Sequence, residues 1–236
     1  MSGPVLLNNV DHADVRVRLG HGAAYGDAIN QIDLFPTEFE AAQRDYPIVF
    51  RRNPDGGYRA VALLGLDRDE NLFLDGEEWR ARYVPALIQR GPFSIGVPRD
   101  GGEPVIHINL DHPRISRSEG EPLFREQGGN APYLDHIAKV LQLIYAGVDV
   151  SAPMFAAFEK LDLIEPVTIE IELTDTRKYR VPDCHTIDRA RLAQLDGTSL
   201  AELHRSDFLR AAIWVASSLG NVSRLIELKL AAERDG

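Results

Sequence analysis

The stretch YPIVFRRNPDGGYRAVALL, residues 46–64, holds two β-prone runs on either side of a cluster of turn-forming residues. The runs are 46–52 and 58–64, and the cluster between them is Asn53-Pro54-Asp55-Gly56-Gly57. Glycine, proline, asparagine and aspartate favour chain reversal because their backbone preferences suit tight turns. The stretch therefore predicts a β-hairpin, and we expect the front half of the chain to be mostly sheet.

Further strands are expected after this hairpin. Residues 71–75 are a candidate third strand, and residues 93–97 and 104–110 are two more. The segment 98–102, Pro-Arg-Asp-Gly-Gly, supplies a loose turn between the last two.

Two short helices are expected in the same half. Thr37 precedes Glu40 by three residues, which is the spacing of a capping box that begins a helix. A second helix is predicted over residues 81–89, where Gly91-Pro92 follows and proline cannot continue helical hydrogen bonding.

The chain changes character after residues 116–122, a polar segment with breaker residues that we interpret as a linker. Asn130 is the expected N-cap of a helix that ends near Gly147 and has apolar residues at three-to-four spacing. One face of this helix must be buried, and it is formed by Leu134, Ile137, Leu141 and Ile144. Ser151 is expected to cap a second helix, which ends near residue 161.

A second hairpin is predicted near residues 167–182. Residues 167–173 alternate apolar and polar side chains, and residues 177–181 return as their partner across 174–176. Helices follow from 187 to 234, with Asp207 and Asn221 as N-caps. The apolar face of residues 208–230 packs either on the core or on a second subunit.

These elements predict an α+β fold with an antiparallel-sheet-rich N-terminal half and a helical C-terminal half that carries the hairpin. We expect one domain over residues 1–236, with a sheet-rich part at 1–116 and a mainly helical part at 130–236.

Charge and composition limit the partners. The 236 residues include 26 lysines and arginines against 36 acids, a formal charge of -10. Nucleic-acid binding and docking on anionic lipid both need a basic surface, so neither is expected. The apolar stretch 137–158 contains Lys139, Asp149 and Pro153, which argues against a membrane span. With no signal peptide recognised and Cys184 as the single cysteine, the expected location is the cytoplasm.

The pair His12 and Asp14 is the sharpest chemical pattern. A histidine and a carboxylate two residues apart can present two metal ligands from one strand edge, and with His107 they would form the two-histidine, one-carboxylate face of non-haem iron enzymes. Fe(II) is the cofactor under this hypothesis, and Arg117 would pair with an oxo-acid co-substrate. The alternative is that His12 and Asp14 lie on the surface at a strand entry.

Aromatic residues crowd into the front half, and most of them are expected in the core. Trp79 and Tyr83 stand beside Arg80 and Arg82, a combination that can line a recognition groove. No phosphate-binding glycine loop, nucleophile elbow or zinc-binding helix motif occurs.

The order of several segments resembles the SapC-like family of bacterial proteins. The resemblance covers nearly the whole chain and rests on residues 12–17, 45–51, 61–66, 70–75, 79, 83–86, 90–93, 120–124, 161–166 and 187–195. Members are sometimes labelled transporter permeases. That label does not fit this sequence, for which neither a membrane span nor an export signal is expected. They are commonly encoded beside TonB-dependent receptors, cupin-like proteins and halogenase-like flavoproteins, which implies a shared uptake or modification pathway.

Two functions follow from these observations. The first is a soluble accessory or binding protein that acts with a bacterial uptake or protein/peptide-modification pathway and has a protein or peptide partner. The second is an iron-dependent, 2-oxo-acid-dependent oxygenase that uses His12, Asp14 and His107.

Overall fold

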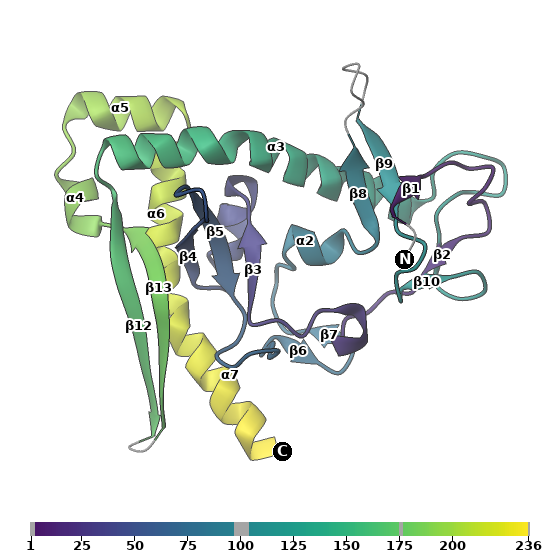
Figure 1. The fold of residues 1–236 in the computed structure, drawn as a ribbon, viewed down its shortest axis with the longest axis horizontal. Helices are drawn as coiled ribbons and strands as arrows, with labels where there is room; N and C mark the ends of the chain where they lie inside the picture. The colour runs from purple at the N-terminus through teal and green to yellow at the C-terminus, as the bar shows by residue number, and fades with distance from the viewer. Residues whose placement is uncertain (1–2, 97–103, 175–176, 236) are drawn as a thin grey trace.

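The five-stranded antiparallel sheet of the protein is built around the predicted hairpin (Figure 1). A computed structural model describes residues 3–96, 104–174 and 177–235. In it β4 (Ile48–Arg52) pairs with β5 (Tyr58–Leu63), and the Asn53 N–H donates to the Gly57 carbonyl to close the turn. The hairpin and the α+β class are therefore confirmed.

The strand order β12-β13-β4-β5-β3 joins segments from both halves of the chain. The second predicted hairpin is present, with β12 at Ile164–Thr174 and β13 at Arg177–Ile187. Its predicted turn includes residues 175 and 176, which lie outside the described residues. His185 of β13 stands opposite Phe50 of β4, and β3 (Gln31–Leu34) pairs with β5 at the other edge.

Strand β4 begins with a buried apolar run. Ile48, Val49 and Phe50 are fully buried, as a continuous apolar run predicts. The Phe50 ring lies 5.0 Å from the ring of Phe155 in α3 (Pro132–Lys160). On α6 (Phe208–Ser218), the Ser218 hydroxyl accepts the Ile48 N–H at 2.9 Å. Helices from the rear half therefore complete the core of the front half.

Two three-stranded sheets form a smaller lobe. One has the order β1-β9-β8, with β1 at Val5–Leu6, β8 at Phe93–Gly96 and β9 at Val105–Ile108. The predicted strands at 93–97 and 104–110 are thus present, and the turn predicted at 98–102 lies outside the described residues. The first half of α3 packs against this lobe, whose core includes Val15, Val17, Phe93, Ile108, Leu123, Leu134, Ile137 and Leu141.

The linker prediction for residues 116–122 is wrong. This segment holds β11 (Glu121–Pro122) and the end of β10 (Ile115–Ser116), and both pair with β2 (Arg16–Val17). Strands of two residues carry too little periodicity to be recognised in a polar sequence.

Helix α3 replaces the two helices predicted at 130–147 and 151–161. It runs without a break through Gly147, and the Ser151 hydroxyl donates to the Gly147 carbonyl at 2.7 Å within the helix instead of capping a new one. Its N-cap is Ala131 rather than Asn130. In Figure 1, α3 spans the protein from the β12–β13 hairpin to β8 and β9.

By length and apolar composition alone, α3 could also cross a membrane. The core helix of a soluble protein can meet the same two criteria. Here α3 contributes buried side chains to both lobes. The absence of a membrane span stays a prediction.

Two further predictions in the front half need correction. Residues 71–75 do not join the main sheet, since β6 (Leu74–Asp75) pairs only with β7 (Glu78–Trp79). The helix expected over 81–89 is only α2 (Ala86–Gln89), because Pro85 is its N-cap and has an extended backbone.

Three of the predicted helix caps do not act as predicted. The Thr37 hydroxyl donates to the Leu143 carbonyl at 3.0 Å, and the helical segment begins earlier with η2 (Pro36–Glu38), followed by α1 (Phe39–Ala42). Asp207 is the N-cap of α6 but makes no side-chain cap bond, and the Asn221 amide donates to two carbonyls of the front half. Tertiary hydrogen bonds take Thr37 and Asn221 away from their local roles, whereas Asp207 pairs with Arg210 of its own helix at 3.0 Å.

The remaining elements are short 3-10 turns and the C-terminal helices. Asp188 and Asp196 cap α4 and α5 with their side chains. Val215 of α6 and Leu225 of α7 are fully buried, so the tail packs on the core. The bounds are η1 Ala23–Tyr25, α4 Arg189–Ala193, α5 Gly197–Arg205, η3 Leu219–Asn221 and α7 Val222–Asp235.

The close approach of α3 to η2 gives a prediction about Gly147. A Cβ at this position would fall 2.6 Å from the Thr37 hydroxyl oxygen and closer still to Phe35. Gly→Ala in a helix ordinarily stabilises by roughly 0.5–1 kcal/mol. We expect Gly147→Ala to do the opposite and lower the free energy of unfolding in urea by roughly 1–3 kcal/mol.

The matched control is Ala146→Ser, at the exposed neighbouring position of the same helix. It should change the free energy of unfolding by no more than about 0.5 kcal/mol. A stabilising Gly147→Ala would show that α3 and η2 do not pack this closely.

Candidate functional site

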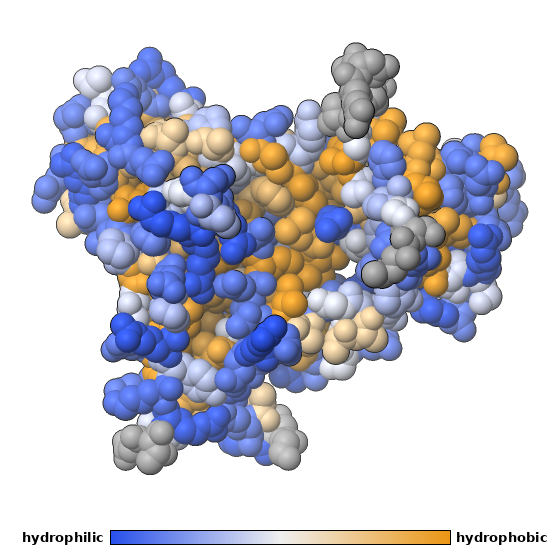
Figure 2. Space-filling view, viewed as in Figure 1, coloured by the Kyte–Doolittle hydropathy of each residue, from blue (hydrophilic) through white to orange (hydrophobic). Residues whose placement is uncertain are grey.

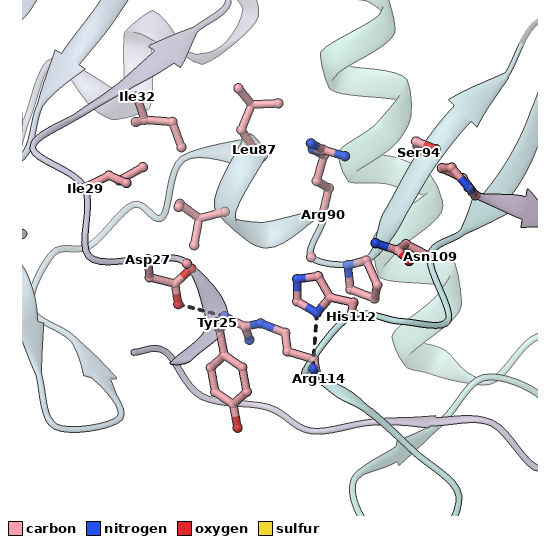
Figure 3. A pocket seen from close by; sticks show the side chains of 15 residues that line it. Tyr25, Asp27, Ile29, Ile32, Leu87, Arg90, Ser94, Asn109, His112 and Arg114 are labelled. Carbon is pink, nitrogen blue, oxygen red and sulfur yellow. Dashed lines mark hydrogen bonds and ion pairs between the residues drawn. The ribbon is translucent and has the colours of Figure 1, made fainter. Parts of the chain in front are cut away.

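Two clefts meet at Arg114 and share the side chain of Ile88. We name the first, of about 450 Å³, the Arg90 cleft, and the second, of about 380 Å³, the Tyr83 cleft. Figure 3 shows the Arg90 cleft, where Ile29, Ile32 and Leu87 face Ser94 and Asn109 across the opening. The Tyr83 cleft is lined chiefly by His21, Arg82, Tyr83, Gln89, Tyr133 and His136.

One wall of the Arg90 cleft is apolar. Ile29 precedes β3, Ile32 lies on β3, and Leu87 lies on α2. Figure 2 shows apolar residues gathered on the face of the protein where β3, α2 and α3 lie. A ligand in this cleft would therefore bury apolar surface on one side.

A buried ion pair joins the two clefts. The Arg114 guanidinium lies 2.9 Å from the Asp27 carboxylate, and the side chains are 9% and 5% exposed. Arg114 also lies 4.5 Å from the ring centre of Tyr25 and donates to the Gly20 carbonyl. One arginine therefore fixes the loop of residues 18–27 against the start of β10.

The Asp27 carboxylate is held in its charged form. It accepts the Gly22 N–H at 2.9 Å, and His21 Nδ1 lies 3.7 Å away. Burial alone would raise the pKa of Asp27, but the nearby His21 ring, the hydrogen bond from the Gly22 N–H and the charge of Arg114 together lower it below its ordinary value.

Arg90 differs from Arg114 in having no carboxylate partner among the described residues. Its Nη1 donates to the Phe93 carbonyl at 2.9 Å, and its buried Nε has no partner. Burial lowers the pKa of Arg90, with no neighbouring acid to oppose the shift. The cleft thus holds one positive charge that the described side chains leave without a counter-ion.

His112 is suited to remain neutral. Its Nδ1 accepts the Arg114 backbone N–H at 3.1 Å, a bond that a protonated imidazole could not accept. Burial and the charge of Arg114 lower the pKa of His112, and they outweigh the opposite effect of Asp27. Arg90 therefore carries the net charge of the cleft.

A buried hydrogen-bond network supports the Tyr83 cleft. Glu38 accepts the Tyr83 hydroxyl at 2.8 Å and the Ala86 N–H at 2.7 Å. Burial raises the pKa of Glu38, although these bonds act in the opposite direction. The Tyr46 hydroxyl donates to the Tyr83 carbonyl and accepts the Trp79 indole N–H. The network fixes the extended segment that precedes α2.

The predicted groove residues divide into two pairs. Arg82 and Tyr83 line the Tyr83 cleft. Trp79 is half-buried beneath it, with its ring 5.2 Å from His21, and Arg80 is exposed and forms an ion pair with Asp75 at 2.6 Å. Recognition by the groove stays a prediction, with Arg82 and Tyr83 as its accessible members.

The predicted metal ligands are engaged separately. His12 is buried, and its Nδ1 lies 3.1 Å from the Asn8 N–H, which donates to it. Asp14 forms an exposed ion pair with Arg117, while His107 is half-buried on β9. Over residues 3–96, 104–174 and 177–235, no three histidine, cysteine or acidic side chains form a group that could hold a metal ion. The structure thus does not assemble the iron site.

Three residues of the clefts were not singled out by sequence reasoning. Arg90 follows the helix predicted over residues 81–89, and Arg114 and Asp27 lie outside every predicted element. No local signal in the sequence marks these residues, because their roles depend on partners that are distant along the chain.

Comparison with known proteins identifies one family. The model of the SapC family matches residues 7–225, which is most of the chain and includes every residue of the two clefts except Pro4. No curated protein matches the chain, and no solved structure does.

The buried ion pair predicts a specific pH dependence. Asp27→Asn should lower the free energy of unfolding by about 3 kcal/mol at neutral pH, because it leaves Arg114 buried without its partner. Since the pKa of Asp27 is lowered in the folded state, its contribution is present above the ordinary value of 3.8 and is lost as the pH falls below it. The wild type and Asp27→Asn should therefore differ less in their free energies of unfolding, measured with a chemical denaturant, as the pH falls below 3.8.

Asp33→Asn is the control, since Asp33 pairs with Arg59 at 2.6 Å on the surface, where both side chains are 43% exposed. Its effect should stay below about 1 kcal/mol. Equal effects of the two substitutions would mean that the Asp27 pair is not buried in solution.

Proposed function

This chain belongs to the SapC family, and we propose that it is a binding protein that serves a bacterial uptake or peptide-modification pathway as a cytoplasmic accessory. Its partner is a peptide or a segment of a protein. The observation that carries the proposal is the pair of clefts that meet at Arg114.

The chemistry of the two clefts suits peptide side chains. The Arg90 cleft offers the apolar wall of Ile29, Ile32 and Leu87. The Tyr83 cleft offers aromatic rings and an exposed arginine, a combination enriched where proteins bind one another. Each volume lies in the range of specific ligand sites. Adjacent sites of different character favour a ligand with several side chains.

The buried carboxylates in and beneath the clefts support binding more than catalysis. Asp27 holds Arg114 and accepts the Gly22 N–H, and Glu38 accepts three donors. A general acid or base must have a proton position free to meet a substrate. These groups instead fix the walls of the clefts, which lowers the entropy cost of binding.

The oxygenase hypothesis has no comparable support. It requires His12, Asp14 and His107 to bind one metal ion, and the described side chains do not assemble that group. We derive no reaction through iron.

A photo-crosslinking experiment in the native bacterium tests the proposal. Tyr25 lines the Arg90 cleft, and benzoylphenylalanine in its place keeps an aromatic ring beside Arg114. We expect irradiation to give an adduct of discrete mass from position 25, which mass spectrometry would identify as a peptide or protein.

Tyr145 is the matched control, because it lies 36% exposed on α3 outside both clefts. The same replacement there should give no such adduct. The binding function would be contradicted by the absence of an adduct from position 25, or by the same adducts from both positions.

A further inference from the structure

We propose that Arg90 is the receptor for a carboxylate attached to an apolar group, carried by the partner in the Arg90 cleft. This inference rests on the proposed function and names the chemistry of the ligand. It follows from the contrast between two arginines in one cleft.

Arg114 is already neutralised, and Arg90 is not. Arg114 pairs with Asp27 at 2.9 Å. Arg90 has one hydrogen bond, to the Phe93 carbonyl, and no ion pair within the part of the chain that the structure describes. Because a partly buried charge without a counter-ion is costly, an anionic ligand would relieve that cost on binding.

The accessible part of the Arg90 guanidinium faces the cleft. Figure 3 shows the group between Leu87 and Ser94, with Asn109 and His112 further along the same wall. The Phe93 carbonyl takes one Nη1 N–H, which leaves the second Nη1 N–H and the two Nη2 N–H groups as donors for an incoming oxygen. Ser94 and Asn109 add neutral polar side chains beside it.

The surroundings favour a carboxylate over a phosphate. A phosphate carries up to two negative charges and is usually met by several cationic or backbone donors. Here a single unpaired guanidinium stands opposite Ile29, Ile32 and Leu87, and His112 remains neutral. One negative charge on an apolar group matches this arrangement.

The chain end of a peptide and a free organic acid share this chemistry. Three probes separate them: an N-acetylated tetrapeptide that ends in leucine as the free acid, the same peptide with a C-terminal amide, and 4-methylpentanoate. Binding of each to the full protein is measured by isothermal titration calorimetry at low salt, because salt screens charges.

We expect the free-acid peptide to bind at least about tenfold more tightly than the amide, as the loss of a charge-assisted hydrogen bond predicts. In Arg90→Met this difference should disappear, and Arg90→Lys should retain part of it. Arg68→Met, at an arginine whose side chain is 93% exposed and lies outside the cleft, should behave as the wild type.

The comparison of acid with amide uses the unaltered protein, so it remains decisive even if Arg90→Met fails to fold. If 4-methylpentanoate binds as tightly as the free-acid peptide, the carboxylate receptor is supported, and the ligand is a free acid, which contradicts the peptide partner of the proposed function. Much weaker binding of 4-methylpentanoate supports a peptide chain end.

Equal binding of acid and amide, or no binding of any probe, overturns the inference about Arg90. If the adduct from position 25 is still formed in that case, the binding function stands without it. If the adduct is also absent, both proposals fail.

Discussion

The continuity of helix α3 is the constraint on which the arrangement of the two lobes depends. Leu134, Ile137 and Leu141 are buried against the small sheets, whereas Phe155 and Phe158 are buried against the main sheet. A helix of 29 residues is about 43 Å long. Because one continuous helix contributes side chains to both cores, it fixes the two lobes relative to each other, and the two clefts lie beside α2 between them.

The sequence predicted those parts of the fold whose signals are local. The hairpin at residues 46–64 has its turn chemistry between two apolar runs, and β12 shows alternation along its own length. Strand β3 has only four residues, and its pairing with β5 depends on chain that follows later. The backbone of Gly120 has a φ of +95°, and a Cβ at this position would collide with the Val17 backbone. A glycine that suggested a linker in the sequence is therefore required where β11 pairs with β2.

The candidate site was less predictable than the fold for a related reason. An arginine is usually solvated, and nothing local in the sequence distinguishes Arg90 or Arg114 from an exposed arginine such as Arg68. Their roles arise from burial and from whether a carboxylate reaches them, which only the tertiary structure determines. The same holds for Glu38, whose partners Tyr83 and Ala86 come from a different segment. Aromatic residues beside arginines did indicate the region, and Arg82 and Tyr83 line a cleft there.

The pairing of β13 with β4 also sets the order in which the chain can fold during synthesis. His185 stands opposite Phe50, so β4 leaves the ribosome long before the strand that completes its edge. At translation rates of about 5–20 residues per second, the delay is on the order of ten seconds. During that interval β4 presents an unpaired edge, and it also presents the side chain of Phe50, which α3 later covers. A nascent chain of this protein is therefore most prone to aggregation before its C-terminal third has been made.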